Sequence, residues 1–514
     1  MIAPGRVFLV GAGPGEPELI TQRGARRLAQ ADVVLYDALA HPDLLELARP
    51  EAERIFVGKR AGRVNERQES ISARMIEAAR AGKCVVRLKG GDPYLFGRGS
   101  EEAEALAAAG IAFEVVPGVG SPSAAAAYAG ISLTHRDLGS SVAYVTASES
   151  AEKDRSSHDW SKLATATDTI VFFMGSRKLA QLMDLLVEHG RAPETPAAVV
   201  VRGSLPSQRV IVGTVATLAV RAKEADAGTP ALTIVGRVVE LRHALRWFDT
   251  KPLFGARVLV TRPEGSESEL VTMLRDEGAE PVRAPAIAIA PPLDPAPLAR
   301  AVRELGSYAW VVLTSANGVR ALFGALDEAG LDARAFGAAR VLSIGPATAA
   351  SLRARGIRAD VVPSEFRGEA AAEALLAAGD VRGKRILLPR AEVARDVLPE
   401  TLKAAGALVD VVTAYRNVAP SEAARARIAE LVRTRRVDVV TFTAPSTVRE
   451  VLAALGEGGA QALGALRIAS IGPVTTEAAE KAGVRVDVTA KEYTAAGLVV
   501  ALVEDARENP RTAS

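Results

Sequence analysis

The sequence is poor in cysteine, histidine and aromatic residues, and each scarcity excludes a kind of structure. Cys84 is the only cysteine in 514 residues, which excludes an intramolecular disulfide and a cysteine-based metal cluster. The five histidines are scattered without the spacing of metal ligands, so we expect no metal site. Aromatic residues make up 4% of the chain and hydrophobic residues 48%, so we expect cores built mainly from Val, Leu, Ile and Ala.

A strong net charge and long apolar runs are also missing. The 63 basic and 61 acidic residues leave a net charge of +2, which is too small to indicate a nucleic-acid partner. No stretch approaches 18 uninterrupted apolar residues, and the first residues lack the apolar segment of a signal peptide. We therefore expect a cytoplasmic protein of three or four domains that binds neither nucleic acid nor a membrane.

Glycine, in contrast, is concentrated in three loops of the N-terminal half. The loops are GAGPGEP at 11–17, KGGDPYLFGRGSEE at 89–102 and PGVGSPSAAAAYAGISLTHR at 117–136. Each follows an apolar run that is typical of a buried strand. Because glycine lets a ligand approach the backbone closely, the three loops predict a small-molecule pocket lined by backbone.

The first loop alone leaves the ligand open. Residues 6–10 and 31–37 read as strands and residues 17–30 as a helix, which makes a βαβ unit of the kind that binds dinucleotides. However, the third glycine of that motif is replaced by Glu16, and Pro14 lacks an N–H that a phosphate would need. A nicotinamide or flavin site and a tight turn without a ligand are both alternatives at this point.

Taken together, the three loops resemble those of the tetrapyrrole methylases, which use S-adenosylmethionine, and most closely the uroporphyrinogen-III C-methyltransferases. The resemblance covers roughly residues 5–245. It also includes LYD at 35–37, GKR at 58–60, FFMG at 172–175, RGSLPSQ at 202–208 and PALTIVGRVVEL at 230–241. It implies the two-subdomain α/β fold of these methylases.

The resemblance also implies roles for individual residues. The positions that hold the methyl donor, largely through backbone groups, are matched by Pro14, Gly90, Gly91, Asp92, Leu95, Gly120, Ser121, Met174 and Gly203. Asp37 matches a proposed proton acceptor and Lys59 a proposed proton donor. Arg98, with Glu101 three residues further on, matches residues implicated in catalysis and in holding the macrocycle. The alternative for these two is an exposed ion pair at the start of a helix.

The C-terminal half contains an internal duplication. The matching pairs are RVLVTR at 257–262 with RILLPR at 385–390, VVLTSANGV at 311–319 with VTFTAPSTV at 440–448, and SIGPAT at 343–348 with SIGPVT at 470–475. All three are separated by about 128 residues. Two copies of one α/β unit therefore fill this half.

Residues 255–505 resemble the uroporphyrinogen-III synthases, through VTRP at 260–263, the duplicated strings above and AYRN at 414–417. The resemblance implies two flavodoxin-like lobes joined by a two-stranded hinge. The expected division is a methyltransferase at 1–245, a linker at 246–254, and a synthase at 255–510 with lobe one at 255–290 plus 418–510 and lobe two at 291–415.

In this half the resemblance suggests that Tyr415 assists the departure of hydroxide from the substrate, and that Ser315, Thr348 and Thr475 contact the substrate. Each has a structural alternative. Tyr415 would also suit a packed strand at the hinge, and the other three would also suit helix caps.

The two resemblances together predict a bifunctional enzyme. The C-terminal half would close hydroxymethylbilane to uroporphyrinogen III, and the N-terminal half would methylate that product at C2 and C7 to give precorrin-2, toward siroheme or cobalamin. The resemblance also implies a homodimer through the methyltransferase half. The alternatives are another corrinoid substrate for the methyltransferase, and a C-terminal half that binds tetrapyrroles without catalysis.

Overall fold

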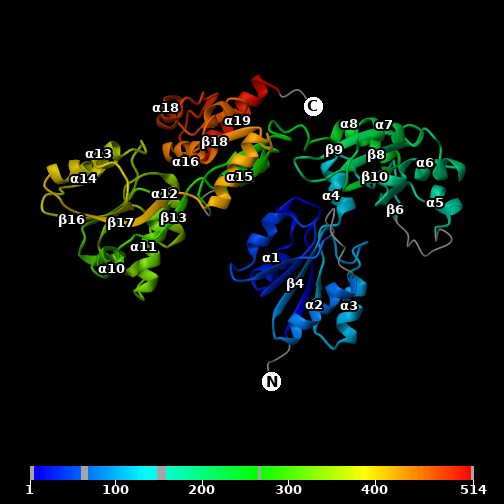
Figure 1. The fold of residues 1–514 in the computed structure, drawn as a ribbon, viewed down its shortest axis with the longest axis horizontal. Coiled ribbons are helices and arrows are strands. Elements are labelled where there is room, and N and C mark those ends of the chain that lie inside the picture. Colours follow the sequence, from blue (N-terminus) through cyan, green and yellow to red (C-terminus); the bar gives the residue numbers. More distant parts are fainter. Residues whose placement is uncertain (1–4, 59–67, 148–157, 264–267, 511–514) are drawn as a thin grey trace. The chain divides into compact units, whose positions relative to one another are not determined.

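The computed structural model describes residues 5–58, 68–147, 158–263 and 268–510 (Figure 1). The strands form four five-stranded sheets, each with helices packed against it. The chain forms two compact units. The first comprises the residues up to Arg257, Thr272–Pro281 and the residues from Val503 onward, and the second comprises Val258–Val271 and Val282–Leu502. In the described ranges, no helix is both long and apolar enough to span a membrane.

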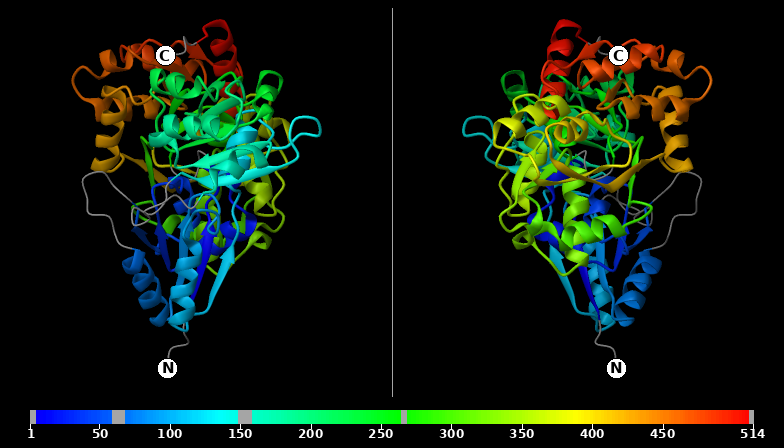
Figure 2. Two further views of the ribbon diagram at one scale, coloured as in Figure 1. Left: turned by 90° about the vertical axis from the view of Figure 1, so that its right-hand side faces the viewer. Right: turned by 90° about the vertical axis from the view of Figure 1, so that its left-hand side faces the viewer.

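The first sheet is entirely parallel and has the strand order β3-β2-β4-β1-β5. Its elements are β1 (Arg6–Gly11), α1 (Gln22–Ala29), β2 (Val33–Tyr36), β3 (Glu53–Phe56), α2 (Gln68–Arg80), β4 (Cys84–Lys89), α3 (Gly99–Ala108) and β5 (Phe113–Val116). Helices α2 and α3 pack side by side on one face of this sheet (Figures 1 and 2). Because β4, β1 and β5 are neighbours, the three glycine loops that follow them begin at one carboxyl edge.

The second sheet is mixed and has the order β6-β7-β10-β8-β9, in which only β6 and β7 run parallel. Its elements are α4 (Ser121–Tyr128), β6 (Val142–Thr146), α5 (Trp160–Ala166), β7 (Thr169–Phe173), α6 (Leu179–Glu188), β8 (Pro196–Val201), β9 (Arg209–Thr214), α7 (Leu218–Glu224), β10 (Ala231–Val235) and α8 (Arg242–Leu245). Valine, leucine and alanine dominate its core, as the composition predicts, with Phe172 fully buried among them.

The segment that follows α8 packs on helix α4. The indole Nε1 of Trp247 donates a hydrogen bond to the carbonyl of Ala127 at 3.0 Å, and the Phe248 ring lies 4.7 Å from the Tyr128 ring, edge to face. This segment therefore belongs to the structure of the first unit.

The third and fourth sheets repeat one topology. The third, β12-β11-β18-β19-β20, comprises β11 (Arg257–Val260), β12 (Glu280–Arg283), β18 (Val439–Phe442), β19 (Arg467–Ser470) and β20 (Val488–Thr489), with α9 (Ser268–Asp276), α15 (Glu422–Arg433), α16 (Pro445–Leu455), α17 (Gly459–Leu463), α18 (Pro473–Lys481) and α19 (Ala495–Glu508). Numbered along the chain, its strand order is 2-1-3-4-5, which is the flavodoxin-like order.

The fourth sheet has the order β13-β17-β16-β14-β15. Its elements are β13 (Ala288–Ala290), α10 (Ala296–Arg303), β14 (Trp310–Leu313), α11 (Ala316–Glu328), β15 (Arg340–Ser343), α12 (Pro346–Ala354), α13 (Gly368–Ala377), β16 (Arg385–Ala391), α14 (Val397–Ala404) and β17 (Leu408–Val418). Read from its other edge, the order β15-β14-β16-β17-β13 corresponds to β12-β11-β18-β19-β20 of the third sheet. The last position is taken by β13, which runs antiparallel to the end of β17, with Ala288 opposite Val418. The predicted α/β fold class, with two N-terminal subdomains and two flavodoxin-like lobes, is confirmed.

Candidate functional site

The backbones of the three glycine loops touch one another at the carboxyl edge of the first sheet. The N–H of Gly91 donates to the carbonyl of Gly13 at 2.6 Å, and the N–H of Gly13 donates back at 3.3 Å. A Cβ added to Gly118 would lie 2.2 Å from the carbonyl oxygen of Gly91 and 2.8 Å from the Cα of Gly11. Such distances are too short for any side chain, so the packing of the loops requires glycine.

Asp92 connects the second loop to the third. Its Oδ1 accepts a hydrogen bond from the N–H of Tyr94 at 2.8 Å, and its Oδ2 accepts one from the N–H of Gly118 at 3.0 Å. Gly91 has φ +68°, and a Cβ there would lie 2.8 Å from the Ser121 hydroxyl. The carboxylate of Asp92 therefore fixes the shape of the loops, in addition to the donor contact that the sequence suggests for it.

Residues of the second subdomain complete the same region. The Ser204 hydroxyl accepts a hydrogen bond from the N–H of Glu16 at 3.2 Å, and a Cβ on Gly203 would lie 2.5 Å from the Cβ of Ala125 in α4. The ring of Phe96 from the second loop lies 4.6 Å from that of Phe173 at the end of β7. The nine predicted donor-binding residues thus come from loops that meet where the two subdomains join.

Backbone strain is concentrated at this junction. In the described ranges, seven residues other than glycine have a positive φ, and five of them are here, namely Phe96, Arg98, Met174, Arg202 and Ser204. A side chain in this conformation costs free energy and is typically kept where function requires it. The strain therefore makes the junction a candidate ligand site independently of the sequence motifs.

Of the predicted catalytic residues near this junction, Asp37 has the most defined surroundings. Its Oδ1 accepts a hydrogen bond from the N–H of Leu39 at 3.0 Å, and its Oδ2 lies 3.5 Å from an Nη of the buried Arg87. Lys59 lies outside the described residues. Arg98 pairs with Glu101 at 3.0 Å, and their side chains are 60% and 48% exposed, so both are accessible to a ligand.

Sequence reasoning missed a buried charged cluster beneath helix α3. Arg87 and Lys89 project from β4 toward Glu102, which has no exposed surface. Burial, and after it the adjacent Arg87 charge, lower the pKa of Lys89. The sequence feature that could have indicated this cluster is the alternation in Val86-Arg87-Leu88-Lys89, which places two cations on one face of the central strand β4.

In the fourth sheet's lobe, two of the predicted residues are in contact. The hydroxyls of Ser315 and Tyr415 lie 3.0 Å apart, and the Ser315 hydroxyl also accepts a hydrogen bond from the N–H of Gly318 at 3.0 Å. Tyr415 is only 8% exposed and packs in the core of its lobe. Thr348 and Thr475 lie in the first turns of α12 and α18 and are 4% and 3% exposed.

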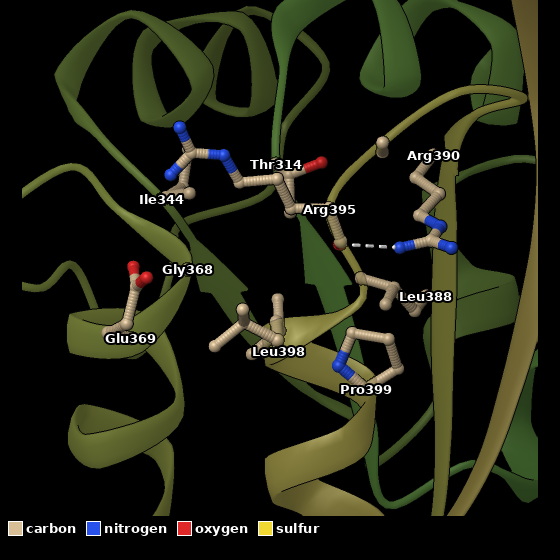
Figure 3. Close-up of a pocket in the computed structure, with 11 residues that line it drawn as sticks. Thr314, Ile344, Gly368, Glu369, Leu388, Arg390, Arg395, Leu398 and Pro399 are labelled. Atoms are coloured by element: carbon tan, nitrogen blue, oxygen red, sulfur yellow. Dashed lines mark hydrogen bonds between the residues drawn. The ribbon is translucent and has the colours of Figure 1, made fainter. Parts of the chain in front are cut away.

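The same lobe holds a pocket of about 150 Å³ at the carboxyl ends of β14 and β16 (Figure 3). It is lined by Thr314, Ile344, Gly368, Glu369, Leu388, Arg390, Ala394, Arg395, Val397, Leu398 and Pro399. Gly368 and Val397 begin helices α13 and α14, and the Arg395 side chain extends over the pocket (Figure 3). Two helix N-termini and Arg395 suit an anionic group here, although the carboxylate of Glu369 also lines the pocket (Figure 3).

Two family models divide the chain between them. The model described as tetrapyrrole (corrin/porphyrin) methylases matches residues 6–219, and the model described as uroporphyrinogen-III synthase HemD matches residues 268–500. The porphyrin biosynthesis protein HemD of Ruminiclostridium josui is 38% identical over 500 residues, which cover 97% of this chain and 98% of that protein. The chain belongs to both families. This fused methylase–synthase is therefore an enzyme of tetrapyrrole biosynthesis with a methyltransferase half and a HemD-like half.

Other relatives match one half each. The siroheme synthase of Pseudomonas fluorescens strain Pf0-1 is 51% identical over 250 residues, or 48% of this chain and 53% of that protein. The crystal structure of uroporphyrin-III-C-methyltransferase from Thermus thermophilus has 42% identity and a TM-score of 0.40, and covers 48% of this chain and 98% of that one. A mutant uroporphyrinogen III synthase from the same organism has 21% identity and a TM-score of 0.36, with coverages of 49% and 99%. The chain thus spans about half the length of the siroheme synthase that it matches.

Proposed function

We propose that the fused methylase–synthase makes precorrin-2 from hydroxymethylbilane in two steps. Its HemD-like half closes hydroxymethylbilane to uroporphyrinogen III, and its methyltransferase half methylates that product at C2 and C7 with S-adenosylmethionine. The observation that carries the proposal is the junction of the three glycine loops, in a chain whose two halves belong to the families of these two reactions. The product lies on the way to siroheme or cobalamin.

The loop junction fits S-adenosylmethionine, which supplies an electrophilic methyl group. Among the described residues, a Cβ on Gly120 would make ordinary contacts with Pro122 at 3.7 Å and Leu95 at 3.8 Å, so no atom crowds this backbone. Met174, at the end of the second subdomain's β7, is exposed. We infer that Pro14, Gly90, Gly91, Asp92, Leu95, Gly120, Ser121, Met174 and Gly203 form the cradle of the donor.

Methylation of a pyrrole carbon requires a base, because the macrocycle must afterwards lose a proton. Asp37 is suited to this role, since it directly follows β2 at the carboxyl edge and its Oδ1 orientation is fixed by the N–H of Leu39. Lys59 is the proposed proton donor. The exposed Arg98, paired with Glu101, can exchange that partner for a carboxylate of the substrate, which carries eight.

In the synthase half we infer that Tyr415 donates a hydrogen bond to the departing hydroxide and that Ser315, in contact with it, orients the phenol. The N-termini of α13 and α14 and the side chain of Arg395 suit a substrate carboxylate in the adjacent pocket. Thr348 and Thr475 lie in the first turns of equivalent helices of the two copies, and we infer that these turns contact further carboxylates of the substrate; the N–H of Thr475 itself donates to the carbonyl of Gly472 at 3.0 Å.

One observation favours a second candidate for this half. Tyr415 is almost completely buried, so a lobe that binds tetrapyrroles without catalysis would also account for it. Replacing Tyr415 with phenylalanine separates the two: a catalytic tyrosine lowers the rate of ring closure, whereas a packing tyrosine changes only stability or affinity.

The test is to incubate the full chain anaerobically with hydroxymethylbilane, with and without S-adenosylmethionine, and to identify the products by mass and by isomer. Uroporphyrinogen III without the donor and a product two methyl groups heavier with it are the expected results. The type I isomer alone, at the spontaneous rate, would refute the synthase. Unmethylated type III isomer would refute uroporphyrinogen III as the methyltransferase's substrate and favour another corrinoid intermediate.

The resemblance of the first half also leads us to propose a homodimer formed through that half and a location in the cytoplasm. Light scattering during gel filtration measures the first of these. A mass near 53.7 kDa would indicate a monomer and contradict it.

A further inference from the structure

The buried cluster beneath helix α3 lies directly behind Asp37, and no step proposed above uses it. Its charged members are Arg87 and Lys89 on β4 and Glu102 on α3. Glu102 has no exposed surface, and the other two side chains are 5% exposed. The cluster therefore lies inside the sheet-and-helix layer, at the base of the loop that begins at Gly90.

Among the described residues, all the hydrogen bonds to the Glu102 carboxylate converge on one of its oxygens. Its Oε1 accepts from the Nζ of Lys89 at 3.0 Å, from the Nε of Arg87 at 3.2 Å and from the side-chain amide of Gln68 at 2.9 Å. In the part of the chain that is described, its Oε2 has no partner. The carboxylate thus binds both cations through Oε1, while Oε2 is buried without a hydrogen bond in the described residues.

Arg87 bridges this buried carboxylate to the active-site edge. While its Nε donates to Glu102, one Nη donates to the carbonyl of Leu88 at 3.0 Å and the other lies 3.5 Å from the Oδ2 of Asp37. A guanidinium can make these contacts together because its N–H groups form a rigid planar fork. A lysine at the same position could not.

Such a cluster is poorly explained by stability. Burying charges costs several kcal/mol per ion, and well-packed apolar residues in place of a buried ion pair are often as stable or more so. The rest of this face of the sheet is apolar, with Val7, Leu35 and Leu106 among its core residues. A protein is expected to bear the free-energy cost of burying such charges where they act on a functional group, which here is the neighbouring Asp37.

We propose that Glu102 and Arg87 are positioning residues for methyl transfer, in which Glu102 fixes the guanidinium of Arg87 and Arg87 holds the carboxylate of Asp37 toward the substrate. The inference rests on the proposed function, because it takes Asp37 as the proton acceptor. We assign Lys89 a different role from that of Arg87. Its Nζ donates to the same oxygen of Glu102, so it balances the buried charge without orienting the base.

The experiment uses the full chain and four variants. Glu102→Gln keeps the shape of the side chain and removes its charge, whereas Arg87→Lys keeps the charge and removes the fork. The double variant Lys89→Met with Glu102→Gln removes one cation with one anion, which spares the fold an unbalanced charge. Glu104→Gln makes the same chemical change at an exposed position of helix α3 and is the matched control.

For each variant, kcat and KM for uroporphyrinogen III are measured at saturating S-adenosylmethionine, together with the pH–rate profile. We expect kcat to fall about 10-fold to 100-fold in the first three variants, with KM nearly unchanged, because a misoriented base affects the chemical step more than binding. Glu104→Gln should match the wild type. Binding of S-adenosylhomocysteine by the same samples reports whether the methyltransferase half of each variant is folded, since ring closure would report only on the other compact unit.

The pH–rate profile separates positioning from a purely structural role. Among the described residues, the groups that face Asp37 or its partners are Arg87 and Lys89 from β4, Glu102 from α3 and the neutral Gln68 from α2. Removal of the Glu102 charge frees the guanidinium that contacts Asp37. The pH–rate profile of Glu102→Gln should therefore differ from that of the wild type, whereas the profile of Glu104→Gln should coincide with it.

A folded Glu102→Gln variant with the wild-type kcat and profile would overturn the inference. If that variant does not fold, the charge-balanced double variant decides in the same way, and Arg87→Lys decides if both fail. A wild-type chain that closes the ring but does not methylate uroporphyrinogen III would instead refute the proposed function, and the inference with it.

Discussion

The closest backbone approach in the loop junction gives the sharpest test of how the donor site is built. In the variant Gly118→Ala the new Cβ would lie 2.2 Å from the carbonyl oxygen of Gly91. An ordinary contact begins at 3.4 Å, so the two loops must separate by about 1.2 Å. Both atoms belong to backbone, and therefore no rotamer change can relieve the overlap. The same movement stretches the hydrogen bond from Gly118 to Asp92.

The expected loss follows from that displacement. Overpacking of this kind costs about 1–3 kcal/mol of stability, and a shift of about 1 Å in a positioned group can cost about 100-fold in rate. We therefore expect Gly118→Ala to bind S-adenosylhomocysteine far more weakly in a calorimetric titration and to lose about 100-fold in kcat/KM for methylation. Ring closure by the other half should be unchanged.

Gly228→Ala is the matched control. A Cβ at Gly228 would meet nothing within 4 Å, and its φ lies outside the left-handed region, so this variant should bind and react like the wild type. If Gly118→Ala bound S-adenosylhomocysteine as tightly as Gly228→Ala, the contact between the loops would not be what shapes the donor site, and the reasoning would be refuted.

Three further predictions concern the synthase half. Gly324→Ala, in helix α11 with nothing within 4 Å of the new Cβ, should stabilise that half by about 0.5–1 kcal/mol in urea unfolding, and no gain would contradict it. Burial and a hydrogen bond to Asp410 raise the pKa of Tyr308 to about 12, from about 10 in the unfolded chain. Because the raised pKa favours the protonated native state, the extra stability of the wild type over Tyr308→Phe should be fully present below about pH 10 and should disappear toward about pH 12. An equal difference in melting temperature between the two proteins at both pH values would refute this. Ser315→Ala removes the cap of α11 and the contact with Tyr415, and should cost about 1 kcal/mol in unfolding and slow ring closure; an unchanged rate would argue against the hydroxyl pair.

The sequence was sufficient to predict that the three glycine loops come together, because glycine content and the preceding apolar runs are local signals; that they surround a ligand stays a prediction. It could not supply the strand order. The order β4-β1-β5 makes the loops neighbours, and only the folded sheet reveals that Gly118 must fit against Gly91. The duplication likewise predicted two equivalent α/β lobes. The exchange between the copies is seen in the sheets, because β11 and β12 of the first copy pair into one sheet with β18–β20 of the second.

The buried charges could not be predicted, because their local signals have ordinary explanations. Glu102 lies in the first turn of an alanine-rich helix, where an acid is expected to complement the helix dipole. Arg87 and Lys89 alternate with apolar residues, as on a strand with one exposed face. In the structure α2 and α3 cover that face, which converts three apparent surface charges into a buried cluster. Whether Thr348 and Thr475 contact a ligand is similarly invisible in sequence, since a buried threonine in a first turn has the same pattern.

The two copies in the synthase half differ at the N-cap of one pair of equivalent helices. Ser315 begins helix α11 with a hydroxyl that accepts from Gly318 and contacts Tyr415, whereas the matching residue of the second copy is Ala444, which offers no side-chain cap to α16. Under the proposed function we therefore expect the departure of hydroxide to be assisted at the end of β14, where the hydroxyls of Ser315 and Tyr415 meet, and not at the equivalent turn that carries Ala444.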